Sequence, residues 1–453
     1  MTISNIIHSV AIIGAGPSGL ALANALKTEG IFSKIKMFER QPQVGGVWNY
    51  SDETRNTPLI PSTSPFEKEP TLVKNGKPMY YSPMYKTLET NIPKDVMAFN
   101  NNPFNKEYEI FPTREQVLQY LQGYSKNVNE LVQYNTEVLD VKKDNGVWEI
   151  TSTNYNTETP TSEIEQFDAV AICTGHYDLP YIPQVSGIAA WSAKFPGHIL
   201  HSKYYNDPSD YKDQTILVIG NSASGLDVSM QTADYATKVY RSISSASRMP
   251  YAEDPRITDV PKIREFLPEE GKIVLEDDSI LENIDKIIYC TGYLYSFPFL
   301  NTYNDGQHAD SVLTKGDRIN RLYKQIFYIP DPTLVFINMT KFTIPFPLAE
   351  SQGTVAAAVF SGRITLPDDS TMRECERAEE AEKGNVNAEF HSLVFPKDIE
   401  YYRELQAWLN TATDPSVGFK PVVWDDARYE LRAGAFDKKR LRLENKISQK
   451  LGK

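Results

Sequence analysis

The chain has 453 residues, 41% of them hydrophobic and 11% aromatic, which is enough to form more than one buried core, so two or more domains are expected. Its net charge of −12 argues against nucleic-acid binding, which normally requires a basic surface. The three cysteines, Cys173, Cys290 and Cys375, are too widely spaced for a Cys-x-x-Cys pair, so neither a redox-active disulfide nor a metal site is predicted.

A glycine-rich turn lies near the start of the chain. The apolar run at residues 10–13 predicts a buried parallel strand, residues 17–28 predict a helix, and residues 35–39 predict a second strand. The residues between the first strand and the helix match the G-x-G-x-x-G pattern of dinucleotide-binding turns, and they are Gly14, Ala15, Gly16, Pro17, Ser18 and Gly19. In such turns the glycines allow the backbone to approach a pyrophosphate, which binds at the N-terminus of the helix.

Glu39 ends the second predicted strand, 20 residues after Gly19. A carboxylate at this position accepts hydrogen bonds from ribose hydroxyls and repels a 2′-phosphate. The first turn is therefore predicted to bind FAD or NAD rather than NADP. Arg40, next to Glu39, is included among the expected cofactor-binding residues.

Residues 50–85 are rich in Pro, Ser, Thr and Tyr and have no clear period, which predicts an extended loop. Beyond this loop, Thr113 is expected to be the N-cap of a helix. Gln116, three residues later, would complete a capping box.

A second glycine-rich turn follows the apolar run at residues 216–219, and the strand after it ends in Arg241 instead of an acid. A guanidinium matches a 2′-phosphate bidentately, so this turn is predicted to bind NADPH, which leaves FAD for the first turn. Serine replaces the middle glycine, and serine hydroxyls can themselves bind phosphate. The residues assigned to the second site are Gly220, Ser222, Ser224, Gly225, Asp227 and Arg241. The alternative is a surface arginine beside a degenerate turn.

Two apolar strands end in the same tripeptide, Cys-Thr-Gly, at residues 169–175 and 286–292. Each is followed by a proline-containing stretch of the kind that crosses between domains. We therefore expect residues 177–295 to form an inserted NADPH-binding domain, and residues 1–176 and 296–453 to form a discontinuous FAD-binding domain. The predicted fold class is α/β, with two Rossmann-like dinucleotide-binding domains.

The segment from Phe195 to Tyr205 fits F-x-G-x-x-x-H-x-x-x-[Y/F] at every fixed position, with His201 as its histidine. Through this motif, placed just before the second turn, the chain resembles flavin-containing monooxygenases. The match extends to Gly45–Trp48, Thr90-Asn91 and the strand end at residues 290–293, and it spans most of residues 8–362. The proline-rich stretch at residues 58–83 resembles fungal members. Baeyer–Villiger monooxygenases have Trp at the last motif position, so Tyr205 favours the first family.

The resemblance implies that NADPH reduces FAD and that O2 then forms a flavin C4a-hydroperoxide. This intermediate transfers one oxygen atom to a soft sulfur or nitrogen nucleophile, such as a thiol, a thioether or an amine. The other oxygen atom becomes water. The peroxyflavin is already the electrophile, so no acid–base triad is required. The protein would have to exclude water and prevent loss of the peroxide.

The resemblance also implies roles for individual residues. Asn91 aligns with the active-site asparagine, whose amide can donate and accept near flavin N5 and the nicotinamide ribose. His201 is interpreted as a structural link between the domains, and Trp48 as a residue that packs beside the flavin. Gln352, with Glu350, is expected near the start of a helix over residues 354–360 that faces the flavin pyrimidine. The other expected cofactor-binding residues are Gly46, Val47, Thr90, Val138 and Gly175.

The tail from Lys438 predicts a basic, solvated helix, where animal members of the family commonly carry a hydrophobic anchor. Contact with an anionic membrane surface, such as that of the ER, is the alternative. No apolar run approaches the ~20 residues that span a bilayer, and no secretory signal is evident, so a soluble cytoplasmic enzyme without a transmembrane segment is expected. The oligomeric state, including a homodimer, is left open.

The sequence leaves other functions open. A disulfide reductase with two dinucleotide sites would need a redox cysteine pair, which the spacing argues against. A Baeyer–Villiger monooxygenase, an NADPH-dependent flavin reductase or oxidase, and a non-enzymatic module that only binds the nucleotides are the remaining alternatives.

Overall fold

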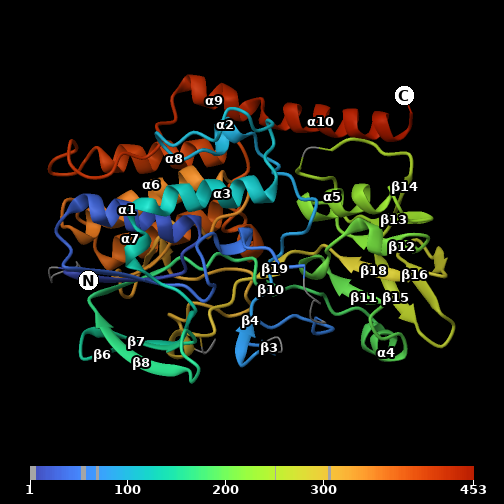
Figure 1. The fold of residues 1–453 in the computed structure, drawn as a ribbon, viewed down its shortest axis with the longest axis horizontal. Coiled ribbons are helices and arrows are strands. Elements are labelled where there is room, and N and C mark those ends of the chain that lie inside the picture. The colour runs from blue at the N-terminus through green and yellow to red at the C-terminus, as the bar shows by residue number, and fades with distance from the viewer. Residues whose placement is uncertain (1–6, 53–57, 68–70, 250, 305–307, 453) are drawn as a thin grey trace. The chain divides into compact units, whose positions relative to one another are not determined.

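The computed structural model describes residues 7–52, 58–67, 71–249, 251–304 and 308–452 (Figure 1). The chain forms two compact units. The first unit comprises Met1–Asn49, Ile92–His176 and Tyr295–Ala433, and the second comprises Tyr50–Asn91, Tyr177–Leu294 and Gly434–Lys453. The second unit thus includes two segments that lie outside the range 177–295 expected for the inserted domain.

The first unit is built on a seven-stranded sheet in the order β20-β21-β22-β9-β1-β2-β5. Strands β22, β9, β1, β2 and β5 are parallel, and β20 and β21 are antiparallel additions at one edge. Their bounds are Ser9–Ile13 (β1), Lys34–Phe38 (β2), Val132–Gln133 (β5), Ala169–Ile172 (β9), Leu322–Tyr323 (β20), Phe327–Tyr328 (β21) and Leu334–Phe336 (β22). The chain connects β1 to neighbours on both sides, which makes its carboxyl end a switch point where such sheets bind ligands.

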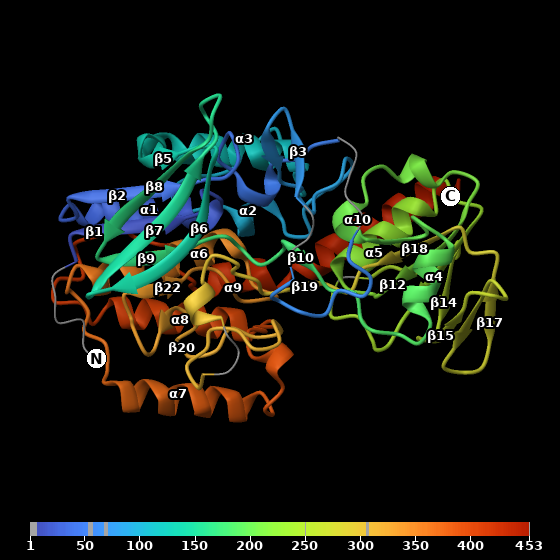
Figure 2. The same cartoon turned by 90° about the horizontal axis from the view of Figure 1, so that it is seen from below.

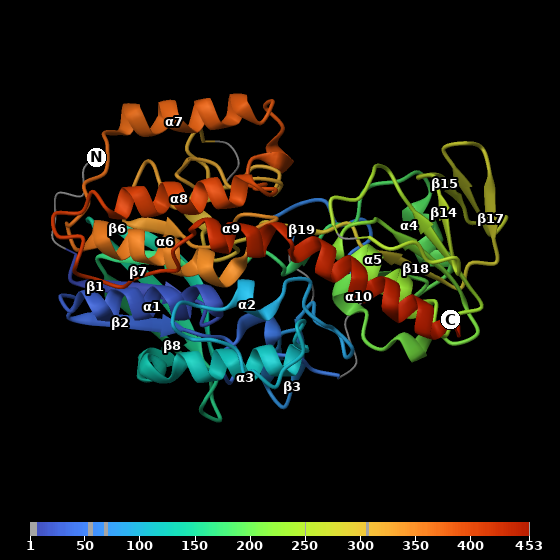
Figure 3. The ribbon, with the colours of Figure 1, turned by 90° about the horizontal axis from the view of Figure 1, so that it is seen from above.

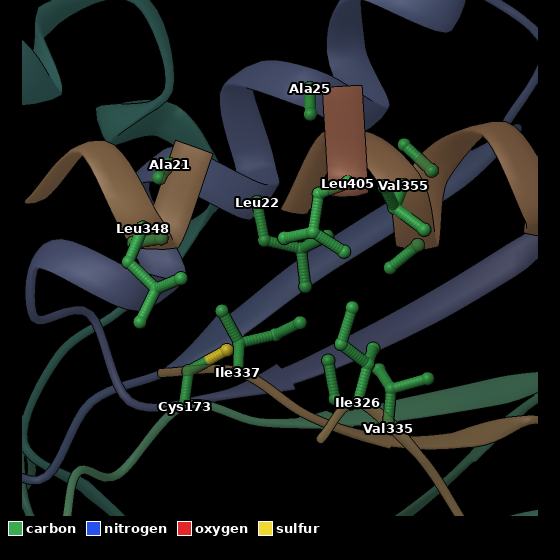
Figure 4. Close-up of a cluster of buried hydrophobic side chains, with 14 of the residues drawn as sticks. Ala21, Leu22, Ala25, Cys173, Ile326, Val335, Ile337, Leu348, Val355 and Leu405 are labelled. Carbon is green, nitrogen blue, oxygen red and sulfur yellow. The ribbon is translucent and has the colours of Figure 1, made fainter. Parts of the chain in front are cut away.

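Helices cover one face of this sheet (Figure 1). The predicted strand–turn–helix–strand is confirmed, because α1 (Pro17–Glu29) lies between β1 and β2. Figure 4 shows α1 together with α6 (Pro345–Phe360) and α8 (Lys397–Leu409) above apolar side chains of the sheet. α1 and α6 pack so closely that a Cβ atom added at Gly353 would lie 3.0 Å from the Cα atom of Leu22.

A three-stranded antiparallel sheet packs on the other face (Figure 2). Its strands are β6 (Thr136–Asp144), β7 (Val147–Asn154) and β8 (Thr161–Phe167). Val138, Trp148 and Phe167 belong to one apolar cluster with Phe38 of β2.

The capping box predicted at Thr113 is confirmed. The Gln116 amide donates to Thr113 Oγ1 at 3.5 Å, and the Thr113 amide donates to Gln116 Oε1 at 3.0 Å, so α3 (Arg114–Tyr124) begins where the sequence predicts. The other helices of the first unit are α2 (Lys94–Met97), α7 (Asp369–Glu382) and α9 (Asp426–Ala433).

The second unit has a five-stranded parallel sheet in the order β11-β18-β12-β13-β14. The second predicted strand–turn–helix–strand is confirmed as β12, α5 and β13. The bounds of the sheet and its helices are Ile199–His201 (β11), Thr215–Ile219 (β12), Lys238–Ser242 (β13), Ile257–Val260 (β14), Lys286–Tyr289 (β18), Ile188–Lys194 (α4) and Ala223–Thr232 (α5). The second unit also contains two small antiparallel sheets, Leu179–Pro180 (β10) with Tyr293–Leu294 (β19), and Ile263–Leu267 (β15) with Lys272–Leu275 (β16) and Ile280–Glu282 (β17), besides the hairpin described next.

The loop expected over residues 50–85 contains regular structure. Strands β3 (Leu72–Lys74) and β4 (Lys77–Met79) form a hairpin, so the prediction of a featureless loop is wrong at this point. Asn75 and Gly76 join them with φ angles of 52° and 73°, as an Asn-Gly hairpin turn requires. Residues 53–57 and 68–70 of the predicted loop lie outside the described residues.

The basic tail forms α10 (Ala435–Lys450), as predicted, but it is not solvated on all sides. Figure 3 shows α10 running along α5. Leu443 and Ile447, one turn apart and therefore on one face of α10, are buried against Met230 of α5 and Ala252. Among the residues described, none of the helices combines the length and apolar character needed to cross a membrane.

Candidate functional site

The first glycine turn leaves no room for side chains. Gly14 has a φ of 102°, and a Cβ atom added there would lie 2.7 Å from the carbonyl oxygen of Cys173. A Cβ atom at Gly19 would lie 2.0 Å from the carbonyl oxygen of Gly14. Both positions therefore require glycine, and the bare backbone at the N-terminus of α1, which begins at Pro17, fits the pyrophosphate of a dinucleotide.

Glu39 lies beside this turn, directly after β2. Its carboxylate is buried and accepts hydrogen bonds from the Ala15 amide at 2.7 Å and the Gln41 amide at 2.8 Å. Burial raises the pKa of Glu39, although these amides and the half-buried Arg40 act in the opposite direction. The sequence therefore correctly places an acid next to the first turn.

A second loop contacts the same turn. The Gly45 amide donates to the Ala15 carbonyl at 3.1 Å, and a Cβ atom at Gly46 would lie 3.0 Å from the Cα atom of Gly16. Gly46, Val47 and Trp48 form one 3₁₀ turn there, and the Trp48 ring packs edge-on against Phe346 with centroids 6.4 Å apart. The structure thus brings the predicted flavin-contacting stretch next to the nucleotide turn.

Gln352 reaches the first turn through a residue that the sequence analysis missed. Asn338 lies just after β22. Its backbone amide donates to Gln352 Oε1 at 2.6 Å, and its side-chain Nδ2 donates to Ser18 Oγ at 3.2 Å. Gln352 Nε2 donates to the hydroxyl of Tyr401 at 2.9 Å. The sequence signal was an Asn immediately after the apolar run at residues 334–337, at the end of a buried strand.

The helix that carries Gln352 and Glu350 starts at Pro345, nine residues before the predicted start at 354, so both residues lie inside it and not near its N-terminus. Pro345 and Pro347 are compatible with helix here because amides in the first turn have no partner within the helix. Glu350 is buried and accepts from the Tyr124 hydroxyl and the Asn100 amide, both at 2.9 Å. Burial raises its pKa to about 8.

Two further predicted residues of the first unit are separate from this network. Val138 is part of the apolar cluster beneath β2. Gly175 follows β9 with a φ of 68° and is half-buried.

The second glycine turn repeats the geometry of the first. Gly220 has a φ of 109°, a Cβ atom added there would lie 2.7 Å from the carbonyl oxygen of Cys290, and one at Gly225 would lie 2.0 Å from that of Gly220. Ser222 is exposed at the N-cap of α5, and Ser224 is half-buried in its first turn. The second turn therefore also leaves the N-terminus of its helix accessible to a phosphate.

Arg241 is buried near the end of β13 and is already paired. Its Nε and Nη2 atoms donate to the two carboxylate oxygens of Asp259 at 2.8 and 3.0 Å, and Nη2 also lies 3.2 Å from the Tyr251 hydroxyl. Asp259 comes from β14, the next strand, in register with Arg241. The sequence indicates the arginine but carries no signal for its partner, Asp259.

His201 is fully buried, with both ring nitrogens in use. Nδ1 accepts from the Lys203 amide at 3.1 Å, so Nε2 carries the proton and donates to the Gly292 carbonyl at 3.0 Å. Burial lowers the pKa of His201 to about 3, so the ring stays neutral. This arrangement favours the structural interpretation of the motif histidine.

Asn91 and Asp227 line one small pocket of the second unit, together with Lys439, Ala223, Leu226, Met230, Met249 and Leu443. Asp227 Oδ2 accepts from the Tyr85 hydroxyl and, at 3.1 Å, from Gln231 Nε2. The preceding residue, Thr90, accepts a hydrogen bond at its carbonyl from Lys439 Nζ at 2.9 Å. The sequence predicted Thr90, Asn91 and Asp227 but not Lys439, which lies on the C-terminal helix.

The sequence matches two family models. Residues 73–249 and 256–424 match the flavin-binding monooxygenase-like family, and residues 12–74 match an NAD(P)-binding Rossmann-like domain. The first match covers well over half of the chain.

Individual relatives agree with this assignment. The chain is 32% identical to a thiol-specific monooxygenase of Saccharomyces cerevisiae over 95% of this chain and 92% of the relative. It is 34% identical to the flavin-containing monooxygenase FMO GS-OX-like 4 of Arabidopsis thaliana over 81% of this chain and 78% of the relative. Among solved structures, S-allyl-L-cysteine S-oxygenase from Allium sativum is similar with a TM-score of 0.78 and 29% identity, over 97% of this chain and 94% of the other.

The two nucleotide turns, the buried acid beside the first of them and the family matches agree with one another. The cofactors are FAD and NADP(H). The chain belongs to the flavin-binding monooxygenase-like family and is an FAD-dependent monooxygenase.

Proposed function

We propose that this enzyme uses NADPH and O2 to transfer one oxygen atom to the sulfur of small thiols or thioethers. The observation that carries the choice of sulfur is the 32% identity, over 95% of the chain, to a protein named as a thiol-specific monooxygenase. The similarity to an S-allyl-L-cysteine S-oxygenase supports the same substrate atom. Sulfur is a soft nucleophile, so it needs no general base to attack an electrophilic oxygen.

The first turn would hold the FAD. Gly14, Gly16 and Gly19 would admit the pyrophosphate at the start of α1, and Glu39 would accept hydrogen bonds from the adenosine ribose. The two Glu39 oxygens are held by backbone amides, so the carboxylate is oriented before the cofactor binds. When bound, FAD supplies the redox chemistry, accepting a hydride from NADPH and activating O2.

The second turn would hold NADPH. Gly220 and Gly225 leave the N-terminus of α5 open to its pyrophosphate, and Arg241 is the candidate for the 2′-phosphate. Asp259 would have to share the guanidinium with that phosphate, because it occupies two of its donors.

Asn91 would supply the active-site amide, which can both donate and accept a hydrogen bond. The pocket that it lines contains Leu226, Met230, Met249 and Leu443, whose apolar side chains would exclude water. His201, at the end of β11, would hold Gly292 through its carbonyl and is not expected to transfer a proton, because both its nitrogens are in use.

The test is to purify the protein with its flavin and follow NADPH oxidation and O2 uptake with cysteamine, with a thioether and with N,N-dimethylaniline. We expect rapid turnover with the sulfur compounds. The thioether should yield a sulfoxide that carries one oxygen atom from ¹⁸O2, whereas cysteamine should yield its disulfide, because the sulfenic acid formed first condenses with a second thiol and releases that oxygen atom as water. The proposal fails if NADPH oxidation yields only hydrogen peroxide, or if only the amine is oxygenated.

A further inference from the structure

Three basic residues of α10 lie on one face of the helix and contact a single short segment. They are Lys439, Arg442 and Lys446, spaced three and four residues apart. Arg442 Nη2 lies 3.3 Å from Glu89 Oε1, and Lys446 Nζ lies 2.9 Å from Glu89 Oε2. Lys439 Nζ donates to the Thr90 carbonyl at 2.9 Å. The C-terminal helix thus holds the two residues that immediately precede Asn91.

Lys439 occupies a position where packing alone would favour an apolar residue. It precedes Leu443 and Ile447 by one and two turns, so it continues their buried stripe, and it is only 5% exposed. Burying an ammonium is costly unless other groups compensate for its lost hydration. The free-energy cost of burying the Lys439 ammonium is explained if its charge has a function beyond attaching α10 to the rest of the unit.

Charged groups from three elements face this ammonium. Asp227 of α5 and Glu89 stabilise its charge, whereas Arg442 and Lys446 of its own helix oppose it. Burial lowers the pKa of Lys439, and the two carboxylates oppose this shift. The Tyr85 hydroxyl, which is neutral, donates a hydrogen bond to Asp227.

Lys439 also lines the pocket that contains Asn91 and Asp227. We propose that Lys439 is a positioning residue, which holds the Thr90 carbonyl so that the side chain of Asn91 points into this pocket in its working orientation. The proposal rests on the proposed function for the importance of Asn91, but the clamp itself is a property of this chain. A charged donor is suited to this task because charge-assisted hydrogen bonds are about twice as strong as neutral ones.

The first test compares Lys439→Met, which keeps the length of the stem, with Lys439→Arg, which keeps a charged donor. Lys450→Met is the matched control, since Lys450 lies on the same helix but pairs with Asp234, at 3.0 Å. Hydrogen–deuterium exchange of the peptide covering residues 85–92 is measured in flavin-free protein. We expect faster exchange in Lys439→Met, and wild-type exchange in Lys439→Arg and Lys450→Met. Unchanged exchange in Lys439→Met would overturn the clamp.

The second readout is steady-state kinetics. We expect Lys439→Met to lower kcat by about 10- to 100-fold with a smaller change in KM for NADPH, because small misplacements of a catalytic group cost rate rather than binding. Lys439→Arg should recover most of that loss. A rise in KM at constant kcat, or no rescue by arginine, would contradict a positioning role.

A pH profile keeps the proposal testable if Lys439→Met does not fold. The Lys439 ammonium loses its proton as the pH rises through its lowered pKa, whereas a guanidinium stays protonated. The alkaline limb of kcat should therefore move to higher pH in Lys439→Arg, and superimposable limbs would argue against the proposal. If wild-type protein oxygenates no sulfur compound, the proposed function fails, and the exchange measurement still decides whether the clamp exists.

Discussion

The guanidinium of Arg241 is hydrogen-bonded to a carboxylate of its own chain. Two of its donors are directed at Asp259, which lies at the corresponding position of the neighbouring strand. This pairing compensates the buried guanidinium for its lost hydration and fixes the plane of its fork. A 2′-phosphate would therefore encounter an oriented cation, with an acid as a competitor.

We expect Arg241→Gln to raise KM for NADPH by about 10- to 100-fold, the equivalent of 1.5–3 kcal/mol for a hydrogen bond to a charged group. KM for NADH, which lacks the 2′-phosphate, should change little. Arg256→Gln is the control, because Arg256 is also held by acids, Asp234 and Asp254, at a different place in the same unit. Equal losses with both nucleotides would contradict the assignment.

Glu350 is expected to make the free energy of unfolding depend on pH. Burial raises its pKa to about 8, above the usual value of 4.5, so between these values the folded state holds a proton that the unfolded state has released. The free energy of unfolding therefore decreases as the pH rises from about 5 to about 8. In flavin-free protein, Glu350→Gln should reduce this dependence of the unfolding midpoint. Parallel pH curves for the two proteins would show that another group is responsible.

Residues whose role depends on their own neighbours in sequence could be predicted, and those that depend on distant partners could not. Glu39 follows directly after β2 and Arg241 lies near the end of β13, each in the strand–turn–helix–strand unit of a glycine turn, so a short-range pattern fixes their places. Asp259, Asn338 and Lys439 act through contacts that only the folded chain creates. The roles of the predicted cofactor residues stay predictions until a ligand is bound.

At the level of elements, the crossing of α1 and α6 depends on one glycine. A Cβ atom at Gly353 would lie 3.0 Å from the Leu22 Cα atom and 3.2 Å from its amide nitrogen, and neither backbone atom can move independently of α1. We expect Gly353→Ala to lower the free energy of unfolding by about 1–3 kcal/mol, the usual cost of overpacking.

The matched control for this change is Gly123→Ala in α3, where an added Cβ atom would meet no atom within 4 Å. Alanine there should be neutral or stabilising by up to about 1 kcal/mol, because it favours helix over glycine. Both effects can be measured by denaturant unfolding. Similar values for the two variants would show that the close approach of the helices is not limiting.

The predicted elements differ in how local their signals are. The capping box at Thr113 fixed the start of α3, because both partners lie within one turn. The predicted start of α6 was nine residues late because the prediction rested on the alanine-rich run at residues 354–360, whereas proline is also favourable in the first turn of a helix. The Asn75-Gly76 hairpin carried a clear signal that the overall composition of the loop obscured.

At the level of the whole molecule, one local design occurs twice. In each unit a strand, a glycine turn and a helix lie next to a strand that is followed directly by Cys-Thr-Gly. In each, the carbonyl oxygen of the cysteine lies 2.7 Å from the position that a Cβ atom would take at the first glycine of the turn, Gly14 or Gly220. The Cys-Thr-Gly tripeptide, which in the sequence is only a repetition, thus identifies the strand that lies beside each glycine turn. The α/β fold class could be predicted from this repetition, while the bounds of the two cofactor domains stay a prediction.

The three thiols should differ sharply in reactivity. Cys173 and Cys290 are buried, and burial raises the pKa of both, whereas Cys375 of α7 is partly exposed. We expect a maleimide to modify Cys375 in the native protein, and to modify the other two only after denaturation. Mass spectrometry of tryptic peptides provides the measurement. Labelling of Cys173 or Cys290 at the rate of Cys375 would mean that the glycine turns open readily.

The burial of Cys173 and Cys290 affects how well the enzyme resists oxidation during turnover. An oxygenase is exposed to the oxidant that it generates, and only the thiolate form of a cysteine is readily attacked. The two cysteines at the nucleotide turns are held as protonated thiols away from solvent. Oxidation of the enzyme during turnover should therefore begin at methionine thioethers, first at Met230 and Met249 in the pocket that Asn91 lines. The cysteines beside the two glycine turns should stay reduced.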